Sequence, residues 1–371
     1  MKDAHRLTLE EKVGQLFLLG FQGYEPDYET QVLLDVVRPS GFLFFHRNIE
    51  SFDQIYELTT RLREMSSIPP LLAIDHEGGR VDRLKQIFAP IPSMPELAAA
   101  GTAQLRFGAR IIAAELEATG FNVDFAPVLD LRLPGSIVAE RCLSAEPVEV
   151  ARLAAAFAEE LSKKNIVACT KHFPGLGGAV IDPHFALPKI NRNRRLLQQE
   201  DAQPFVSLFG EAGMVMMSHG HYPALGDEKC VPASLSPRVI TGFLRKKLGY
   251  KGLVITDDLT MGAVTSIGLT PDLFVRAFEA GNDLLLFSQT TPLVEQGFRS
   301  ILQAARESAL LRRRLDESVD RILALKSSIE VKPLRYRAHL QSRITRQIEK
   351  LRRTMEPAIA ETERGLKPAT T

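Results

Sequence analysis

Short apolar runs recur along the chain and alternate with longer segments of helical periodicity. Most of the runs are continuously apolar rather than alternating, which is typical of strands in a parallel sheet that is buried on both faces. The predicted strands occupy residues 17–20, 42–45, 70–75, 121–127, 166–170, 214–218, 253–256 and 283–287. Between them, segments such as 51–65 and 146–163 repeat apolar residues at three- and four-residue spacing, which indicates amphipathic helices.

Strand and helix alternate about eight times, and this count predicts the fold class. Eight β/α units over residues 1–328 predict an α/β protein, a single-domain (β/α)8 TIM barrel. A doubly wound open sheet is the alternative architecture. No segment within residues 1–328 has the composition of a linker, so we expect one catalytic domain there.

Residues 329–371 differ from residues 1–328 in composition, because they are rich in basic residues and lack the predicted strand–helix alternation. Apolar residues recur at helical spacing between arginines and lysines, at Leu340, Ile344, Ile348, Leu351 and Met355. This pattern predicts a basic helical tail that docks on the barrel exterior, with the last dozen residues disordered. A dimer contact or an anchor on an acidic surface is the alternative role.

Composition narrows the function classes. The chain has 371 residues, 45% of them hydrophobic, and a formal net charge of +1, which gives no reason to expect nucleic acid as a partner. No apolar stretch approaches the roughly 18 residues that a membrane helix needs, and no secretory signal pattern opens the sequence. Three widely spaced cysteines argue against a disulfide framework. We expect a cytoplasmic protein without membrane insertion, as a monomer or weak homodimer.

Candidate chemistry follows the predicted strands. In a barrel, the loops after the C-terminal ends of the strands build the active site. Five predicted strands are followed by polar or charged groups: Asp75, Asp130, Lys171 with His172, His219, and Asp257. Any one of these would be weak support, because strand ends are often polar, but five in one register indicate a pocket.

The segment "KHFPGLGGAVIDPHF" is unusually rich in ionisable groups for a loop. Its glycines, Gly175, Gly177 and Gly178, give backbone freedom that a strand end does not. Asp182 and His184 are two positions apart, so the carboxylate could orient the imidazole as in a base–orienter pair. A surface turn is the alternative interpretation of the same residues.

At this point the motifs resemble those of a known family, the glycoside hydrolase family 3 β-N-acetylglucosaminidases. "KHFPGLG" followed by "DPH" is similar to the family's loop signature. "AIDHEGGRVDRL", "FNVDFAPVLDL" and "VITDDLTMGA" are similar to its substrate-binding, fourth-strand and nucleophile segments, in the expected order. The resemblance covers roughly residues 7–328, and the short single-domain layout is most similar to members that recycle peptidoglycan.

The resemblance implies a retaining exo-glycosidase that acts on terminal N-acetylglucosamine, such as that of muropeptide fragments. It implies Asp257 as nucleophile and His184, oriented by Asp182, as acid/base. The residues implied to bind the sugar are Asp75, Arg83, Arg141, Lys171 and His172. His219 and Asp130 are expected to line the pocket, Glu77 to support it, and no metal or cofactor is implied.

Two details of the motifs qualify these expectations. Asp258 adjoins Asp257, but neighbouring side chains on a strand point to opposite sides, so we expect Asp258 to be a helix N-cap or a salt-bridge partner. Pro183, Leu176 and Gly178 depart from the family's usual loop, and Pro183 stiffens the backbone between Asp182 and His184.

Other functions remain open from the residues. His219 and His221, two apart after a strand, could belong to a metal-dependent amidohydrolase, although we expect His219 to line the pocket and His221 to be structural. A sugar-binding barrel without activity is another possibility. Within the family, a β-glucosidase or a glycoside phosphorylase would show similar motifs.

Overall fold

The computed structural model describes residues 6–226, 230–329 and 339–365. It contains one parallel sheet of eight strands in the order β7-β6-β5-β4-β3-β2-β1-β8. The strands are β1 (Phe17–Gly20), β2 (Gly41–Phe44), β3 (Leu71–Ile74), β4 (Val123–Asp124), β5 (Val167–Phe173), β6 (Met214–Met217), β7 (Leu253–Thr256) and β8 (Leu285–Phe287). A parallel bridge between Ile255 and Leu284 joins the two ends of the sheet, so the strands close into the predicted barrel.

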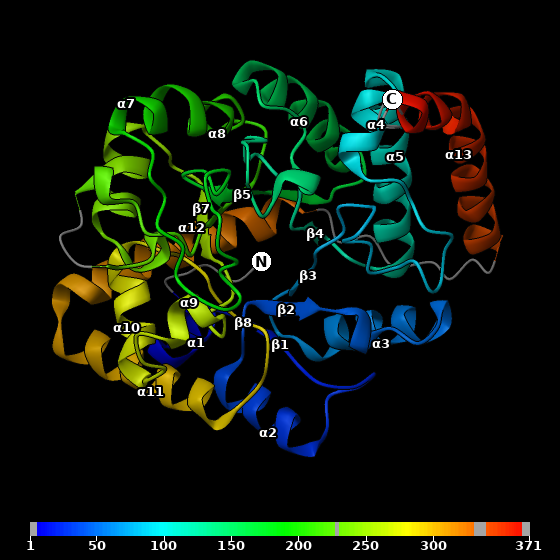
Figure 1. Cartoon of the computed structure of the whole chain (residues 1–371). Helices are drawn as coiled ribbons and strands as arrows, with labels where there is room; N and C mark the ends of the chain where they lie inside the picture. Colours follow the sequence, from blue (N-terminus) through cyan, green and yellow to red (C-terminus); the bar gives the residue numbers. More distant parts are fainter. Residues whose placement is uncertain (1–5, 227–229, 330–338, 366–371) are drawn as a thin grey trace.

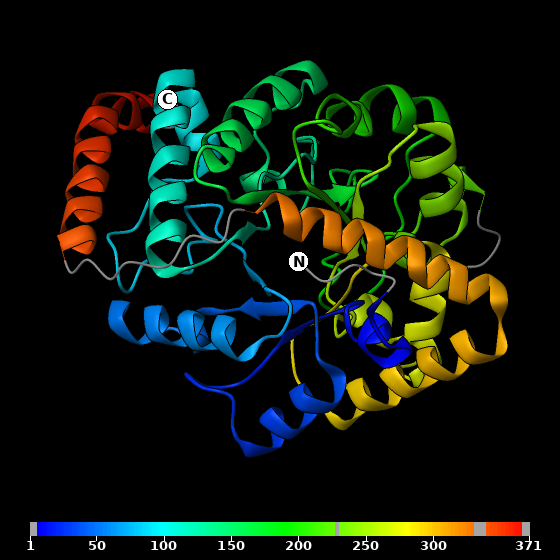
Figure 2. The same cartoon turned by 180° about the vertical axis from the view of Figure 1, so that it is seen from behind.

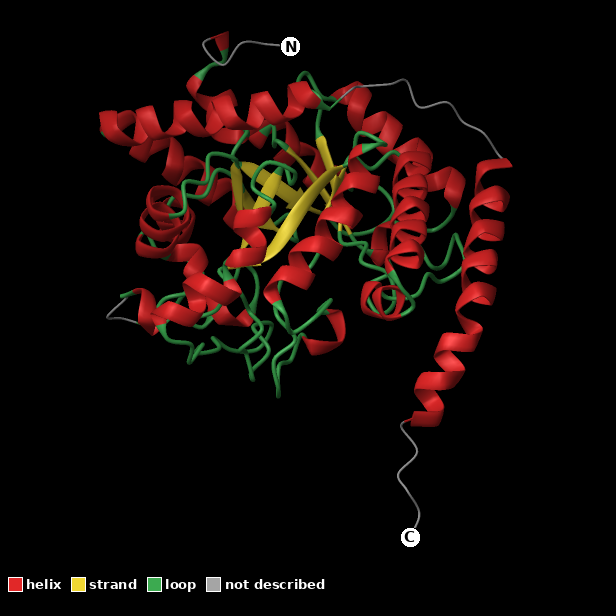
Figure 3. Ribbon diagram, turned by 90° about the horizontal axis from the view of Figure 1, so that it is seen from above, coloured by secondary structure: helices red, strands yellow, loops and turns green. Residues whose placement is uncertain are grey.

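Helices surround the barrel on its outer side (Figure 1, Figure 3). They are α1 (Leu9–Gly14), α2 (Tyr28–Val37), α3 (Phe52–Met65), α4 (Met94–Ala99), α5 (Thr102–Thr119), α6 (Pro147–Ser162), α7 (Arg194–Leu196), α8 (Gln203–Ser207), α9 (Gly262–Thr265), α10 (Pro271–Ala280), α11 (Pro292–Glu307), α12 (Ala309–Ser328) and α13 (His339–Gly365), with a π-helical segment at Arg238–Lys247. The sequence sets several ends locally. Ser51 caps the N-terminus of α3, and Gly120 ends α5 in the left-handed conformation (φ 87).

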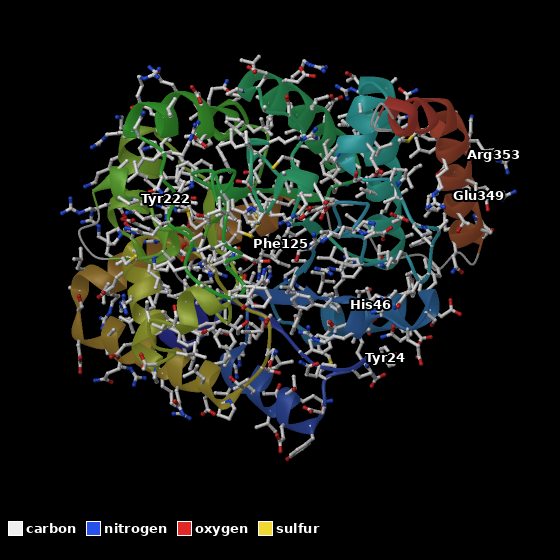
Figure 4. The ribbon with its side chains drawn as sticks, in the orientation of Figure 1. Tyr24, His46, Phe125, Tyr222, Glu349 and Arg353 are labelled. Atoms are coloured by element: carbon white, nitrogen blue, oxygen red, sulfur yellow. The ribbon has the colours of Figure 1, made fainter. Side chains whose placement is uncertain are left out.

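Alternation along the strands divides the core into an inner and an outer part. Leu253 and Ile255 pack in one cluster with residues of other strands, such as Phe125, whereas Val254 packs in the cluster under the helices. Phe125 lies near the centre of the barrel (Figure 4). The barrel interior is thus a packed core, and open space for a ligand is left at the ends of the strands.

Buried charges tie α12 to the end of the barrel opposite the predicted site. Asp283, fully buried before β8, accepts hydrogen bonds from Arg245 at 2.6 Å, Arg314 at 3.2 Å and Arg321 at 3.0 Å. Arg314 and Arg321 belong to α12, which crosses the back of the barrel (Figure 2). Because a buried carboxylate must be compensated, this contact fixes α12 across the strand beginnings.

The tail contains the expected helix. α13 packs against α5 and buries Ile344, Ile348, Leu351 and Met355. Its Glu349 and Arg353 point away from the body of the molecule (Figure 4). The helix extends to Gly365, and of the residues expected to be disordered, 366–371 lie outside the described part.

Five of the eight predicted strands differ in length from the observed ones, and the differences at β4 and β5 adjoin the predicted site. β4 covers only two residues of the predicted 121–127, because the side-chain oxygens of Asn122 and Asp124 accept the N–H groups of Leu72 and His76 in place of backbone carbonyls. β5 runs beyond the predicted 166–170 to Phe173, because the Leu129 and Ser218 N–H groups donate to the carbonyls of Lys171 and Phe173. Lys171 and His172 therefore lie within the strand rather than after it.

No helix in the described ranges is long and apolar enough to cross a membrane.

Candidate active site

Alternation aims two of the predicted residues, Asp75 and Asp257, at the mouth of the barrel. On β7, Leu253 and Ile255 face the barrel interior, so Asp257, two residues further on, continues the inward series. Asp75 stands in the same relation to Ala73 on β3. The side chains that fill the barrel therefore give way to carboxylates where the strands end.

A chain of ion pairs links β3, β5 and the loop after β4. The Lys171 ammonium, whose side chain is 2% exposed, donates to Asp75 Oδ1 at 2.6 Å and lies 2.6 Å from Glu77 Oε1. Glu77 also accepts two hydrogen bonds from the guanidinium of Arg141, at 2.7 and 2.9 Å. Burial raises the pKa of Glu77, but the charges of Arg141 and Lys171 outweigh burial and lower it, so Glu77 is ionised.

Asp130 orients His172. Its Oδ2 lies 2.6 Å from His172 Nδ1, and its Oδ1 accepts from the Leu176 N–H at 2.6 Å. Since an ionised carboxylate only accepts hydrogen bonds, Nδ1 carries a proton and Nε2 is left for another partner. Asp130 thus fixes the orientation of the His172 ring and the backbone at the start of the loop after β5.

Asp257 is an ionised carboxylate. Burial raises its pKa, but the nearby imidazoles of His219 and His172 and the Asp258 N–H outweigh burial and hold the pKa below its ordinary value of 3.8. The Asp258 N–H donates to Asp257 Oδ1 at 2.8 Å. His172, Lys171 and His219 all act electrostatically on this one carboxylate, so these residues share one site.

His219 is buried beside Asp257. Its ring lies 2.7 Å from the Ser234 hydroxyl through Nδ1 and 2.9 Å from the Asp258 carbonyl through Nε2. Because a carbonyl oxygen only accepts, Nε2 carries the proton. Burial lowers the pKa of His219, so the ring is neutral near pH 7 and packs against the turn after β7.

Asp182 and His184 form a pair on the loop after β5. Asp182 Oδ1 lies 2.7 Å from His184 Nδ1, and the His184 side chain is 67% exposed. Burial raises the pKa of Asp182, but the His184 N–H, its imidazole and Arg80 outweigh burial and lower it. The loop backbone is hydrogen-bonded to α9, the helix that begins shortly after Asp257.

Loop glycines serve close packing as well as flexibility. Gly175 has φ +127, a conformation that other residues rarely adopt, and its carbonyl accepts from the Tyr222 hydroxyl at 2.9 Å. A Cβ on Gly177 would lie 2.2 Å from the Leu131 carbonyl oxygen. The start of this loop is therefore packed tightly between the loops that follow β4 and β6.

Arg83 has free hydrogen-bonding capacity. Its Nε is buried, and among the described residues no hydrogen-bond partner meets it. Arg47, which the sequence analysis missed, lies close enough to influence it electrostatically and is itself held by the Phe21 and Ser288 carbonyls. The position of Arg47 shortly after the predicted strand 42–45 could have indicated that it lies near the site.

A buried histidine below Asp75 was also missed. His76 is fully buried, 2.8 Å from Glu115 and 3.7 Å from Asp82. Burial lowers the pKa of His76, but the Glu115 carboxylate outweighs burial and raises it to about 9. Asp82 accepts the N–H groups of Leu84 and Ile91, so the charged histidine braces the segment that carries Asp75, Glu77 and Arg83.

Asp258 does not cap a helix as expected. The residue before α9 is Met261, and the Asp258 carboxylate instead accepts from the Thr260 N–H at 3.0 Å, the Thr260 hydroxyl at 2.7 Å and the Ser288 N–H at 3.1 Å. A turn precedes α9 after β7, and the Asp258 carboxylate accepts hydrogen bonds within this turn and from Ser288 instead of at the start of the helix.

His219 and His221 do not assemble a metal site with their neighbours. His221 is buried against the backbone of Val231. In the part of the chain that the structure describes, no group of three or more His, Cys, Asp or Glu side chains is arranged to hold a metal ion.

A barrel with carboxylates at the ends of its strands is typical of enzymes. Comparison of the sequence with known protein families identifies the family to which this chain belongs. Residues 8–325 match the N-terminal domain of glycosyl hydrolase family 3. The chain belongs to this family and is a glycosidase.

Within the family, the chain is similar to proteins named β-hexosaminidase or β-N-acetylglucosaminidase. The chain is 34% identical to the β-hexosaminidase of Idiomarina loihiensis over 72% of this chain and 82% of that protein. It is 36% identical to the β-hexosaminidase of Neisseria meningitidis serogroup C over 72% of this chain and 76% of that protein. The structure of a family 3 β-N-acetylglucosaminidase from Paenibacillus sp. FPU-7 superimposes with a TM-score of 0.86 at 32% identity, over 94% of this chain and 69% of that one.

The ion-pair chain predicts a pH-dependent stability difference. Replacing Glu77 by Gln should lower the free energy of unfolding at pH 7 by about 3–5 kcal/mol, because Lys171 and Arg141 lose a buried partner. The lowered pKa of Glu77 means that its contribution is complete above its ordinary pKa of 4.5 and declines as pH falls below that value.

Urea unfolding at pH 7 and pH 3 measures this difference, which should be smaller at pH 3. Glu149→Gln, in an exposed pair with Arg152, is the control and should change little. An equal loss for Glu77→Gln at both pH values would contradict the interpretation.

Proposed function

We propose that this protein is a retaining exo-β-N-acetylglucosaminidase that removes terminal β-linked N-acetylglucosamine. The observation that carries the proposal is Asp257, a buried, ionised carboxylate directly after β7 whose pKa is lowered by the nearby charges of His172 and Lys171. The His184–Asp182 pair on a loop bonded to the segment after Asp257 supports it. Similarity to proteins named β-hexosaminidase supports the choice of sugar.

In the first step, a carboxylate oxygen of Asp257 attacks carbon 1 of the sugar and displaces the aglycone oxygen. The protonated imidazole of His184 gives its Nε2 proton to that departing oxygen, and a covalent glycosyl-enzyme ester forms. The Nδ1–H of His184 donates to Asp182, which holds the ring and stabilises its charged form.

In the second step, water attacks carbon 1 and the ester bond to Asp257 breaks. The neutral Nε2 of His184 takes a proton from this water, which returns both groups to their starting states. Two displacements at one carbon retain its configuration. The net change is the addition of one water molecule across the glycosidic bond.

The polar groups of the mouth would hold the sugar. Asp75, Lys171 and Arg141 form one ion-paired chain whose remaining donors and acceptors suit sugar hydroxyls. His172 offers its Nε2, because Asp130 takes Nδ1, and Arg83 offers its unpartnered Nε. Fixed charged donors and acceptors favour a polar ligand held by directional hydrogen bonds.

Muropeptide fragments of cell-wall recycling, processed in the cytoplasm, are the natural substrates that we propose. An open cleft of about 600 Å³ beside the site includes Arg80, Arg132 and Glu140 in its lining. Arg80 also acts electrostatically on Asp182, which supports a position of the cleft near the proposed acid/base pair. Arginines there suit the carboxylates of a peptide-bearing aglycone.

Asp257 can be tested by trapping. A 2-acetamido-2-deoxy-5-fluoro glycosyl donor should accumulate as an ester, and peptide mapping should find it on Asp257. Asp257→Ala should lower kcat by about a thousandfold or more, the order seen when enzymes lose a nucleophile. The control is Asp35→Ala, an exposed carboxylate on α2. A label on any other residue would disprove the assignment.

If His184 donates a proton to the leaving group, the loss of kcat/KM on removing His184 should depend on how much the leaving group needs that proton. His184→Ala should lower kcat/KM for glycosides of poor leaving groups by about 10²–10⁴-fold, the usual contribution of general acid–base catalysis. A dinitrophenyl glycoside needs no proton for departure, so its kcat/KM should change much less. Added azide should restore turnover of that substrate by replacing base-assisted water. Equal losses for all substrates would refute the role of His184.

Substrate comparison separates the proposal from the other family activities. The protein should hydrolyse 4-nitrophenyl 2-acetamido-2-deoxy-β-glucoside faster than the matching glucoside, and phosphate should leave the rate unchanged. Preference for the glucoside would indicate a β-glucosidase, and a rate that requires phosphate would indicate a phosphorylase. Binding without turnover would indicate an inactive sugar-binding barrel.

A further inference from the structure

The loop that carries His184 is fixed at both ends. Near its beginning, the Ile137 N–H donates to the Ala179 carbonyl at 3.0 Å, which ties the loop to the one after β4. Near its end, the His221 N–H donates to the Pro188 carbonyl at 2.8 Å, which ties it to the segment after β6. Residues 180–187 between these points carry both members of the Asp182–His184 pair.

Side-chain burial holds only part of the middle of this loop, because Pro183 is buried but most of its neighbours are not. Val180, Ile181 and Phe185 are 66%, 48% and 81% exposed. Apolar side chains that face solvent contribute little to fixing a backbone, because fixation by packing needs buried contacts. Besides the buried Pro183, the position of His184 therefore depends on contacts other than apolar packing.

Two backbone hydrogen bonds supply those contacts. The Gly262 N–H donates to the His184 carbonyl at 3.0 Å, and the Ala263 N–H donates to the Pro183 carbonyl at 2.9 Å. Within the described ranges, these are the hydrogen bonds that join residues 180–187 to another part of the chain. Both donors belong to the first turn of α9, where N–H groups have no partner within the helix.

The approach of the loop to α9 requires a glycine. A Cβ on Gly262 would lie 2.6 Å from the carbonyl oxygens of both His184 and Phe185, closer than any carbon–oxygen contact allows. Gly262 has no positive φ, and alanine is preferred over glycine in helices, so the helix itself gives no reason for glycine here. The reason is the contact with the loop.

The same segment also carries Asp257. Between Asp257 and Gly262 the chain makes a turn that the Asp258 carboxylate holds through the Thr260 N–H and hydroxyl, while the Met261 N–H donates to the Asp258 carbonyl at 3.0 Å. One braced turn thus presents Asp257 at its beginning and the donors that hold His184 at its end.

We propose that Gly262 is a positioning residue for the acid/base: it lets the first turn of α9 latch the His184 loop by its backbone and so sets His184 relative to Asp257. The inference rests on the proposed function of His184. It adds that the geometry of proton transfer depends on a residue that touches neither substrate nor imidazole, only the loop's main chain.

Gly262→Ala tests the latch through leaving-group dependence. The added methyl group should push the loop away from α9, so kcat/KM for a disaccharide or alkyl glycoside should fall about tenfold or more, the effect of losing one or two hydrogen bonds. The dinitrophenyl glycoside should lose less than about threefold, because its departure needs no proton. Gly210→Ala, where the new methyl group meets no atom within 4 Å, is the matched control and should behave as wild type.

A second measurement does not depend on activity. Chymotrypsin should cleave after the exposed Phe185 faster in Gly262→Ala than in wild type and Gly210→Ala, while the thermal unfolding midpoints stay close. Wild-type cleavage and wild-type leaving-group dependence in Gly262→Ala would overturn the latch, and so would an equal loss on all substrates.

His184→Ala, measured on the same substrates, separates the two proposals. If His184→Ala shows the leaving-group dependence and Gly262→Ala does not, the latch alone is wrong. If His184→Ala itself shows no such dependence, the proposed role of His184 fails, whatever Gly262→Ala does.

Discussion

The buried charge of Lys171 organises the mouth of the barrel. An ammonium group with so little exposed surface is tolerated only when opposite charges meet it directly. Asp75 comes from β3, Glu77 from the loop after it, and Arg141 balances Glu77 from the loop after β4. Strand β5 and the segments after β3 and β4 are held in one arrangement, because separating any member would leave a charge unpaired in the protein interior.

The rest of the site divides into a rigid and a less rigid part. Asp257 and His172 stand on strands or directly after them, and their partners Asp258 and Asp130 are held by further hydrogen bonds. His184 is exposed on a long loop whose middle is joined to the barrel by two backbone bonds. Such a division suits the proposed reaction, in which a fixed carboxylate would act at carbon 1 and a proton donor would let the aglycone enter and leave.

Much of the fold could be predicted because it rests on local patterns. Short, mainly apolar runs marked all eight strands, since a strand buried on both faces is apolar at most positions. The inward direction of Asp75 and Asp257 follows from alternation along β3 and β7. The errors arose where partners outside the segment decided the outcome. The Leu72 and His76 N–H groups bind side chains at the ends of β4, the Leu129 and Ser218 N–H groups lengthened β5, and Ser288 drew Asp258 away from a capping role. His76 and Arg47 were missed because neither position shows its partners in the sequence.

By itself, the sequence determined the order of strands and helices, the barrel they form, and the set of polar residues at the strand ends. These depend on periodicity, which neighbouring residues express. Only the tertiary structure decided which polar groups meet. Glu77 pairs with Arg141, Asp130 pairs with His172, and the Gly262 N–H donates to the His184 carbonyl. Such pairs join residues far apart in the chain, and hydrogen bonds and ion pairs act only over a few ångströms, so the closed barrel had to bring the partners together first.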